Sequence, residues 1–376
     1  MEEEAQRIFR AEAAVPYLPD EVTTQIFIKL PVKTLMRLKT VCRRWRWLIS
    51  DPQFVSKHLR LSVKSDHTLK LLTKQADGRF GYASIRALDE NVFAGFEAVN
   101  LGTPFPTRRV ILRGSCNGLL FVEVGVKEFH LWNPLTREVK SLPSMPGVVA
   151  NEIWIRGVLG LGFDEINEDY KVIFAFEDDN ATKQGIVMRH MLYSLRADAW
   201  RDLHDVGMAI KAQYDTSLAF NGALHWFSYK DDDSGDSLLW YIVAFDMASE
   251  RFREIGLPDK LVGRFPVQKL CVNGCLGVVE SHTLSTTYHL WALKNYDDEG
   301  SWSLLYRIPS SWPIHFNRLN TGVFWVSQKG VVLVSPSFDF FLFDPMDCSV
   351  KQLPFDFNAI LLNRSFVESL VSPNRI

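Results

Sequence analysis

The segment that decides the fold lies at residues 17–59 and reads YLPDEVTTQIFIKLPVKTLMRLKTVCRRWRWLISDPQFVSKHL. It is basic and helical in pattern, whereas most of the chain after it has the pattern of β-structure. Pro19 fits the first turn of a helix, because the N–H that a proline lacks has no helical partner there. Asp20 and Glu21 follow, and carboxylates are favourable at the positive end of the helix dipole. The sequence therefore predicts that a helix begins here.

This first predicted helix carries one apolar stripe. Val22, Ile26 and Leu30 follow Leu18 at steps of four, which places all of them on one helical face. The helix is expected to end at Leu30, because Pro31 pushes the residue before it out of the α-helical region.

A second helical pattern starts directly after this proline and is expected to stop at Asp51-Pro52. Its apolar positions are Leu35, Leu38, Val41 or Cys42, Trp45, and Leu48 or Ile49. A domain of three short helices in about 40 residues cannot bury all these side chains by itself, since small domains bury too small a share of their surface. Part of the apolar surface is therefore expected to face a partner.

The whole block resembles an F-box. The resemblance rests on the opening Leu-Pro-x-Glu, the central Leu-Pro, the Val-Cys-x-x-Trp spacing and the closing Asp-Pro-x-Phe, all in one uninterrupted stretch. It implies a three-helix F-box at residues 16–60 that binds the adaptor subunit of an SCF-type cullin–RING ubiquitin ligase. The residues carried over for this contact are Leu18, Pro19, Val22, Ile26, Leu30, Pro31, Val32, Leu35, Leu38, Val41, Cys42, Trp45, Leu48 and Ile49. The sequence does not divide them into contact residues and internal core.

The composition is that of a folded protein with an uneven charge. Of its 376 residues, 47% are hydrophobic and 12% aromatic, which is enough for a substantial core and argues against long disorder. Residues 17–59 hold eight Lys/Arg and three Asp/Glu, net +5, and the rest of the chain holds 34 and 41, net −7. This contrast indicates two surfaces with different partners.

The cysteines and the apolar runs indicate the compartment. Five cysteines are scattered along the chain without the spacing of a disulfide framework, which favours a reducing environment. The opening MEEEAQR lacks the layout of a signal peptide, and the longest apolar run, at residues 238–245, is far short of a membrane span. We expect a soluble protein of the cytoplasm, the nucleus or both, without membrane contact.

From residue 61 the apolar period changes from near 3.6 to near 2. Asn-Gly pairs at 117–118, 221–222 and 273–274 each lie between apolar runs, and such pairs indicate β-hairpins because both turn residues need positive φ. The asparagines are separated by 104 and then 52 residues, which indicates an internal repeat. A Lys-Gly pair at 329–330 continues the series, and residues 167–170 fill its gap.

A second repeated pattern consists of a strand, a turn, another strand and Leu-Pro. FHLWNPLTREVKSLP, YIVAFDMASERFREIGLP and FFLFDPMDCSVKQLP are three versions of it. A period of about 50 residues with about four strands per unit is typical of a kelch-type propeller, and the available length predicts about six blades. SFVESLVS, at residues 365–372, is predicted to close the ring as a strand paired with the first blade, which would remove exposed strand edges.

Most of this second region resembles the F-box-associated interaction domain of a large plant F-box family. The resemblance rests on GSCNGLLFV, LWNPLTREVKSLP, LGFDEINEDYKVI and SFVESLV, although the paired glycines of true kelch repeats are absent. The predicted fold class is therefore α+β multidomain: a flexible lead-in at 1–15, the F-box at 16–60, an all-β propeller-like domain at 61–372 and a tail at 373–376. The resemblance implies a non-catalytic substrate-recognition subunit whose propeller holds a protein target for ubiquitination.

The sequence offers no catalytic constellation, and we predict no catalytic residue, metal or cofactor. Cys271 and Cys275 have a spacing that a metal could use, but the Asn-Gly between them is explained as a repeat turn and no second Cys/His pair lies nearby. The glycines at 157, 160 and 162 are in the wrong order for a dinucleotide-binding loop and indicate bulges or turns. The acidic run at 231–236 indicates a solvated hairpin loop.

Two alternative functions stay open. The basic residues Arg37, Lys39, Arg43, Arg44 and Arg46, interleaved with Trp45 and Trp47, could form a nucleic-acid face. A propeller hydrolase with a helical appendage would instead need carboxylates clustered near the propeller axis. For Trp45, packing inside the helical block and contact with a partner are both consistent with the pattern, and Cys42 is expected to be a small buried apolar residue. No motif indicates the target or the residues that bind it.

Overall fold

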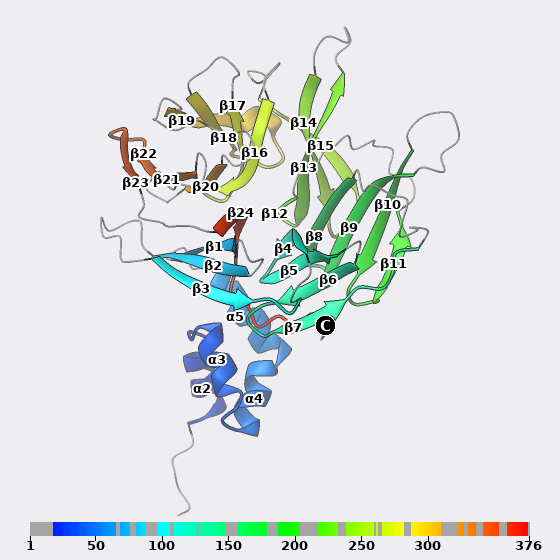
Figure 1. The fold of residues 1–376 in the computed structure, drawn as a ribbon, viewed down its shortest axis with the longest axis vertical. Coiled ribbons are helices and arrows are strands. Elements are labelled where there is room, and N and C mark those ends of the chain that lie inside the picture. Colours follow the sequence, from blue (N-terminus) through cyan, green and yellow to red (C-terminus); the bar gives the residue numbers. More distant parts are fainter. Residues whose placement is uncertain are drawn as a thin grey trace, which may run out of the picture.

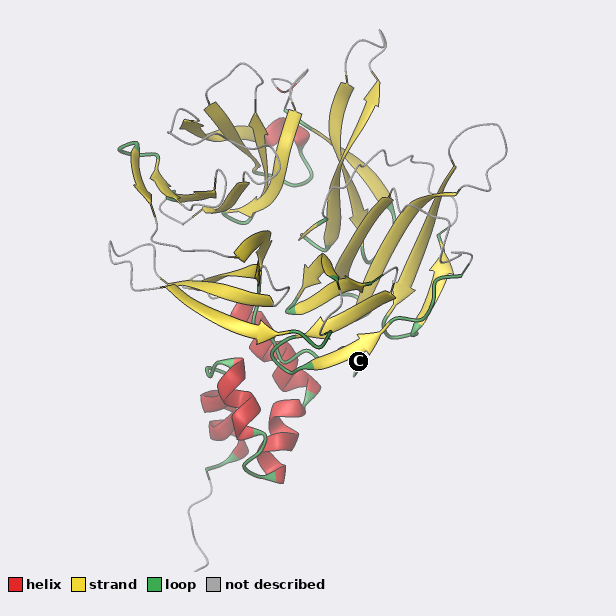
Figure 2. Ribbon diagram, in the orientation of Figure 1, coloured by secondary structure: helices red, strands yellow, loops and turns green. Residues whose placement is uncertain are grey.

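The computed structural model describes residues 18–64, 68–75, 80–86, 96–105, 109–125, 128–146, 157–178, 187–203, 217–231, 238–258, 261, 265–281, 287–309, 322–326, 330–335, 341–352 and 359–374. In this part of the chain a small helical domain lies beside a ring of β-sheets (Figure 1). All the long helices belong to the N-terminal segment, and strands make up nearly all the regular structure of the rest (Figure 2). The predicted fold class, a small helical domain followed by an all-β domain, is confirmed. The lead-in at residues 1–15 and the acidic positions 232–236 lie outside the described residues.

Four helices form the helical domain within residues 18–64, where the sequence predicted three. They are α2 (Asp20–Phe27), α3 (Val32–Leu38), α4 (Arg43–Ser50) and α5 (Pro52–Lys64). The second predicted run is interrupted at Cys42, whose extended backbone (φ −153°, ψ 164°) separates α3 from α4. Asp51 then starts a new helix, because its carboxylate accepts hydrogen bonds from the N–H groups of Gln53 and Phe54 while Pro52 fills the first turn. This last helix continues beyond the predicted limit at residue 60.

In the described residues, six antiparallel sheets of four strands each form the blades of the propeller (Figure 1), in agreement with the predicted number of about six. Blade 1 consists of β24 (Ala359–Ser365), β1 (Thr68–Gln75), β2 (Phe80–Arg86) and β3 (Phe96–Gly102), and blade 2 of β4 (Val110–Cys116), β5 (Leu119–Val124), β6 (Glu128–Asn133) and β7 (Glu138–Ser141). Blade 3 consists of β8 (Gly157–Asp164), β9 (Asp169–Asp178), β10 (Val187–Ser194) and β11 (Ala199–Asp202), and blade 4 of β12 (Leu218–Phe220), β13 (Ala223–Asp231), β14 (Leu238–Asp246) and β15 (Phe252–Gly256). Blade 5 consists of β16 (Phe265–Val272), β17 (Cys275–Ser281), β18 (Thr287–Leu293) and β19 (Trp302–Pro309), with the short 3₁₀ helix η2 (Glu299–Ser301) before its last strand. Blade 6 consists of β20 (Gly322–Val326), β21 (Val332–Ser335), β22 (Phe341–Asp344) and β23 (Ser349–Gln352).

The repeated turns have the geometry that the sequence predicts. The three Asn-Gly pairs join the first two strands of blades 2, 4 and 5, and their six residues have φ between 48° and 81°. Between the third and fourth strands, a side-chain oxygen of Asn133, Asp246 or Asp344 accepts a hydrogen bond from the N–H two residues further on. Asn and Asp recur at these positions because they form such turns with their own backbone.

The C-terminal part of the chain closes the ring, but not with the segment that the sequence predicted. The closing strand is β24, which pairs with β1 as the edge strand of blade 1. Only Ser365 of the predicted closing strand belongs to it; residues 366–372 are not a strand. Four of these residues are nevertheless buried: Phe366, Ser369, Leu370 and Val371. An extended segment with partners on more than one side shows the same apolar alternation as a strand, which explains the wrong prediction.

The glycines of β8 allow neighbouring blades to approach closely, and they mark neither the bulges nor the turns that the sequence predicted. Gly160 and Gly162 lie inside the strand, paired with β9 in regular register. A Cβ atom on Gly160 would lie 2.8 Å from Leu224 Cδ1, and one on Gly162 would lie 2.7 Å from Met247 Sδ. Both neighbours belong to blade 4, so the absent side chains set the spacing between blades 3 and 4.

Candidate functional site

The helical domain has a small core of its own. Its buried apolar residues are Phe27, Ile28, Val32, Leu35, Leu48, Ile49, Phe54 and Leu370, the last contributed by the C-terminal segment. Trp45 is partly buried against this core and meets Phe27 edge-on, with ring centroids 5.1 Å apart and ring planes at 88°. Of the two interpretations of Trp45, internal packing is therefore present in the structure.

A second set of apolar side chains on the same helices faces solvent. On α2, Thr23 and Phe27 point into the protein, whereas Val22 and Ile26 stay 39% and 46% exposed. Leu18, just before this helix, is 55% exposed. Three members of the stripe that the sequence predicted at steps of four are thus exposed on this side of α2, whereas the fourth, Leu30, lies beyond the end of the helix at Phe27 and is half-buried. We call Leu18, Val22 and Ile26 the apolar face of α2.

The structure divides the fourteen residues carried over from the F-box resemblance. Seven are exposed: Leu18, Pro19, Val22, Ile26, Pro31, Val41 and Cys42. Three are half-buried: Leu30, Leu38 and Trp45. Four are buried: Val32, Leu35, Leu48 and Ile49. The buried set supports the fold of the helical domain, and the exposed set is the part that a partner can reach.

The structure differs from the sequence-based expectation at two positions, Cys42 and Trp47. Cys42 is exposed, and its Sγ accepts a hydrogen bond from the N–H of Trp45 at 3.4 Å, so it caps α4 and is not a buried apolar residue. Trp47 is 69% exposed, although the sequence placed it only in the alternative nucleic-acid face and not among the adaptor contacts. A tryptophan on the charged side of an amphipathic helix is the signal that could have singled it out, since large aromatic side chains are favoured anchors at interfaces.

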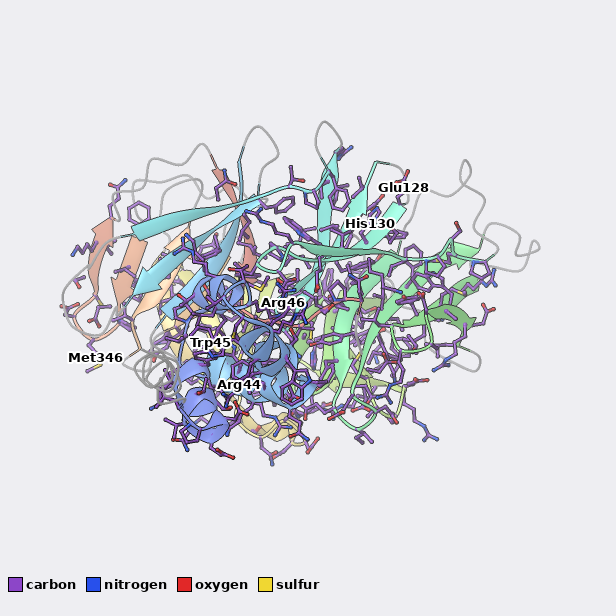
Figure 3. All side chains as sticks on the ribbon, turned by 90° about the horizontal axis from the view of Figure 1, so that it is seen from below. Arg44, Trp45, Arg46, Glu128, His130 and Met346 are labelled. Carbon is purple, nitrogen blue, oxygen red and sulfur yellow. The ribbon has the colours of Figure 1, made fainter. Side chains whose placement is uncertain are left out.

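Two basic residues of α4, Arg44 and Arg46, hold the helices together. The Arg44 guanidinium pairs with the Asp20 carboxylate at 2.8 Å, which joins α4 to the start of α2. Arg46 Nε donates to the Lys39 carbonyl at 3.1 Å, at the end of α3. Figure 3 shows both arginines and Trp45 on the helices in front of the propeller. These intramolecular contacts give Arg44 and Arg46 structural roles that the hypothesis of a nucleic-acid face does not include.

The remaining candidate sites of the sequence do not assemble a chemical centre. Cys271 is the penultimate residue of β16 and Cys275 is the first residue of β17, on either side of the Asn-Gly turn between these strands. Within the described residues, no three His, Cys, Asp or Glu side chains are grouped so that they could hold a metal ion. None of the described helices has the length and apolar character needed to cross a membrane.

Comparison with known protein families agrees with this division into helical domain and propeller. A family model described as "F-box associated beta propeller domain" matches residues 85–352. The chain belongs to this family. A second model, described as "F-box-like", matches residues 15–62, which contain the apolar face of α2 and most of the helical domain. The recognition of an F-box followed by an F-box-associated propeller is confirmed.

Other members of the F-box group are similar along most of their length. An F-box/kelch-repeat protein of Arabidopsis thaliana is 27% identical over 84% of this chain and 85% of its own. The F-box protein CPR1 of the same plant is 24% identical over 93% of this F-box propeller chain and 88% of its own. Among solved structures, an oligogalacturonate lyase of Vibrio parahaemolyticus covers 76% of this chain and 79% of its own at 9% identity, with a TM-score of 0.43. A likeness that weak carries no argument about function.

Proposed function

We propose that this F-box propeller protein is the substrate-recognition subunit of an SCF-type cullin–RING ubiquitin ligase. The observation that carries the proposal is the apolar face of α2, which leaves three large side chains in solvent on a domain that already has a filled core. Exposed apolar groups gathered on one face and rimmed by polar residues are typical of a protein-binding surface. The F-box-like match over the same residues supports the adaptor subunit as the partner.

We assign binding of the target protein to the propeller. The part outside the helical segment has a net charge of −7, against +5 for residues 17–59, so the two ends of the molecule attract different partners. In this role the chain makes and breaks no bonds. It raises the local concentration of a target lysine beside a ubiquitin-conjugating enzyme that the rest of the complex holds.

The proposal is tested by the proteins that co-purify with the full-length chain. Point variants suit this test better than deletions, because Leu370, near the C-terminus, belongs to the helical core. Val22→Glu with Ile26→Glu places two charges in the exposed face and leaves the buried set intact. With degradation blocked, the native chain should capture adaptor, cullin and RING subunits together with proteins that accumulate under the block. The double variant should keep the accumulating proteins and lose the ligase subunits; retention of the ligase subunits by the variant would refute the proposal.

A further inference from the structure

The C-terminal segment at residues 366–374 lies between the helical domain and the propeller. Figure 1 shows it, in red, leaving β24, running past α5 and ending beside β7. It has almost no regular secondary structure, yet Phe366, Ser369, Leu370 and Val371 are buried. An irregular segment at the end of a chain is ordinarily exposed and poorly ordered unless something holds it.

Three consecutive buried residues of this segment have different surroundings. Leu370, 3% exposed, belongs to the core of the helical domain. Val371 belongs to the core between blades 2 and 3, against which Val55 and Leu59 of α5 also pack. Ser369 is fully buried beside the β4–β5 turn, where its Oγ would lie 2.5 Å from a Cβ atom on Gly118. The segment therefore contributes to both domains at once.

Hydrogen bonds from the propeller fix the backbone of the segment. Asn133 Nδ2, fully buried at the end of β6, donates to the carbonyl oxygens of Ser369 at 3.0 Å and Val371 at 2.7 Å. The Tyr82 hydroxyl donates to the Glu368 carboxylate at 2.9 Å. Buried amide donors that satisfy two carbonyls specify one arrangement of the chain, because breaking them leaves polar groups unpaired in the interior.

We propose that residues 366–374 act as a strap that locks the helical domain to the propeller in one orientation. The covalent connection alone does not explain this coupling, since it joins the helical domain to blade 1 only between α5 and β1, whereas the strap ties it to blade 2 as well. For the ligase subunit proposed above, the strap would fix the distance from the adaptor to the target, a consequence that rests on that function. The strap itself is tested on the isolated chain, without adaptor or target.

Glycine variants provide a matched test. Gly118, Gly222 and Gly274 occupy equivalent Asn-Gly turns with φ of 81°, 70° and 73°, so alanine is similarly strained in each backbone. Only Gly118 has the strap against it: a Cβ atom would lie 2.6 Å from the Val367 carbonyl oxygen, whereas at Gly222 and Gly274 nothing lies within 4 Å. Any effect of Gly118→Ala beyond that of the two controls therefore comes from displacing the strap.

The measurement is amide hydrogen exchange in α2, α3 and α4 of the full-length chain. Gly118→Ala lies in the propeller, yet it should speed exchange in these helices by about 30-fold or more, as should Leu370→Ala. Asn133→Asp should also speed exchange in these helices. It keeps the oxygen that caps the turn but replaces the amide donor by a carboxylate, which faces two carbonyl oxygens. Its control is Asp344→Asn, at the same turn position in blade 6. Gly222→Ala, Gly274→Ala and Asp344→Asn should leave the helices at the native rate.

A second measurement keeps the result interpretable if one variant folds poorly. Near-ultraviolet circular dichroism reports the packing of buried propeller tryptophans such as Trp132 and Trp226, and only variants with a native spectrum are compared. For those, small-angle scattering should show a larger maximum dimension than the native chain as the helical domain moves away from the ring. Native exchange rates in the helices of the folded strap variants, or equal acceleration by Gly222→Ala, would overturn the proposal. Neither result would test adaptor binding, because the isolated chain is measured without the adaptor.

Discussion

Two tryptophans of α4, Trp45 and Trp47, have opposite roles because successive residues of a helix turn by about 100°. Trp45 meets Phe27 at the core of the helical domain, whereas Trp47 is 69% exposed. The apolar period of the sequence predicted the inner positions of this helix correctly, since Leu48 and Ile49 are buried as well. It could not predict the cap at Cys42, because a cap depends on where the chain turns and a regular period continues through that point.

Replacing each tryptophan by alanine should therefore have different effects on stability. Trp45→Ala removes a ring packed on the core and should lower the free energy of unfolding by about 3 kcal/mol. Trp47→Ala changes an exposed side chain and should alter it by less than about 0.5 kcal/mol. Urea denaturation of the two variants, followed by far-ultraviolet circular dichroism, measures the difference. Equal losses would show that the assignment of inner and outer faces is wrong.

Neighbouring blades are joined by buried polar contacts as well as by apolar side chains. Lys171 of β9, 6% exposed at its side chain, bonds to the Asp164 carboxylate at 2.6 Å and to the Glu250 carboxylate at 2.8 Å. Glu250 lies in the β14–β15 turn, so this network connects blade 3 to blade 4. Burial by itself would raise the pKa of the Asp164 carboxyl, but hydrogen bonds from Lys171 and Asn167 outweigh it and lower this pKa from 3.8 to about 2.

Removing the cation should destabilise the propeller strongly. Lys171→Met leaves the buried Asp164 carboxylate without its cation, and breaking a buried ion pair from one side costs about 3–5 kcal/mol of unfolding free energy. Lys230→Met is the matched control, because its pair with Glu254 is 58% and 44% exposed and contributes at most about 1 kcal/mol. Midpoints of urea denaturation at pH 7 measure both. A Lys171→Met loss no larger than that of the control would contradict the network.

The same network predicts how stability depends on pH. The pKa of Asp164 is lower in the folded chain, about 2, than the ordinary 3.8, so the folded state favours the ionised carboxylate. Its contribution is therefore complete above about pH 4 and is lost as the pH falls through 2. Urea midpoints between pH 5 and pH 2 should fall more steeply for the native chain than for Asp164→Asn. Parallel slopes for the two proteins would show that this carboxylate does not contribute.

The sequence predicted the ring of blades better than the C-terminal segment that closes the ring and joins it to the helical domain. The spacing of the Asn-Gly turns indicated the blades, because each such turn needs residues that tolerate positive φ and these pairs recur at the same place in blades 2, 4 and 5. The position of the closing strand was wrong, since residues 366–371 alternate for another reason: Phe366 packs in the propeller and Leu370 in the helical domain. Contacts between segments more than 200 residues apart, such as Asn133 with Ser369, leave no local pattern in a sequence. The division of the F-box residues into core and surface likewise required the packed helices.

The most direct measurement of the central claim is a calorimetric titration of the purified full-length chain with the SCF adaptor subunit. The native chain should bind, and Val22→Glu with Ile26→Glu should weaken binding by at least about 100-fold, because each charge must be desolvated in an apolar contact. The control is Gln25→Glu, which adds a charge at an exposed position of the same helix between the two, and it should bind within about threefold of the native chain. Unchanged thermal unfolding of the double variant would show that the loss comes from the surface alone. Native affinity in the folded double variant, or no binding by the native chain, would contradict the account.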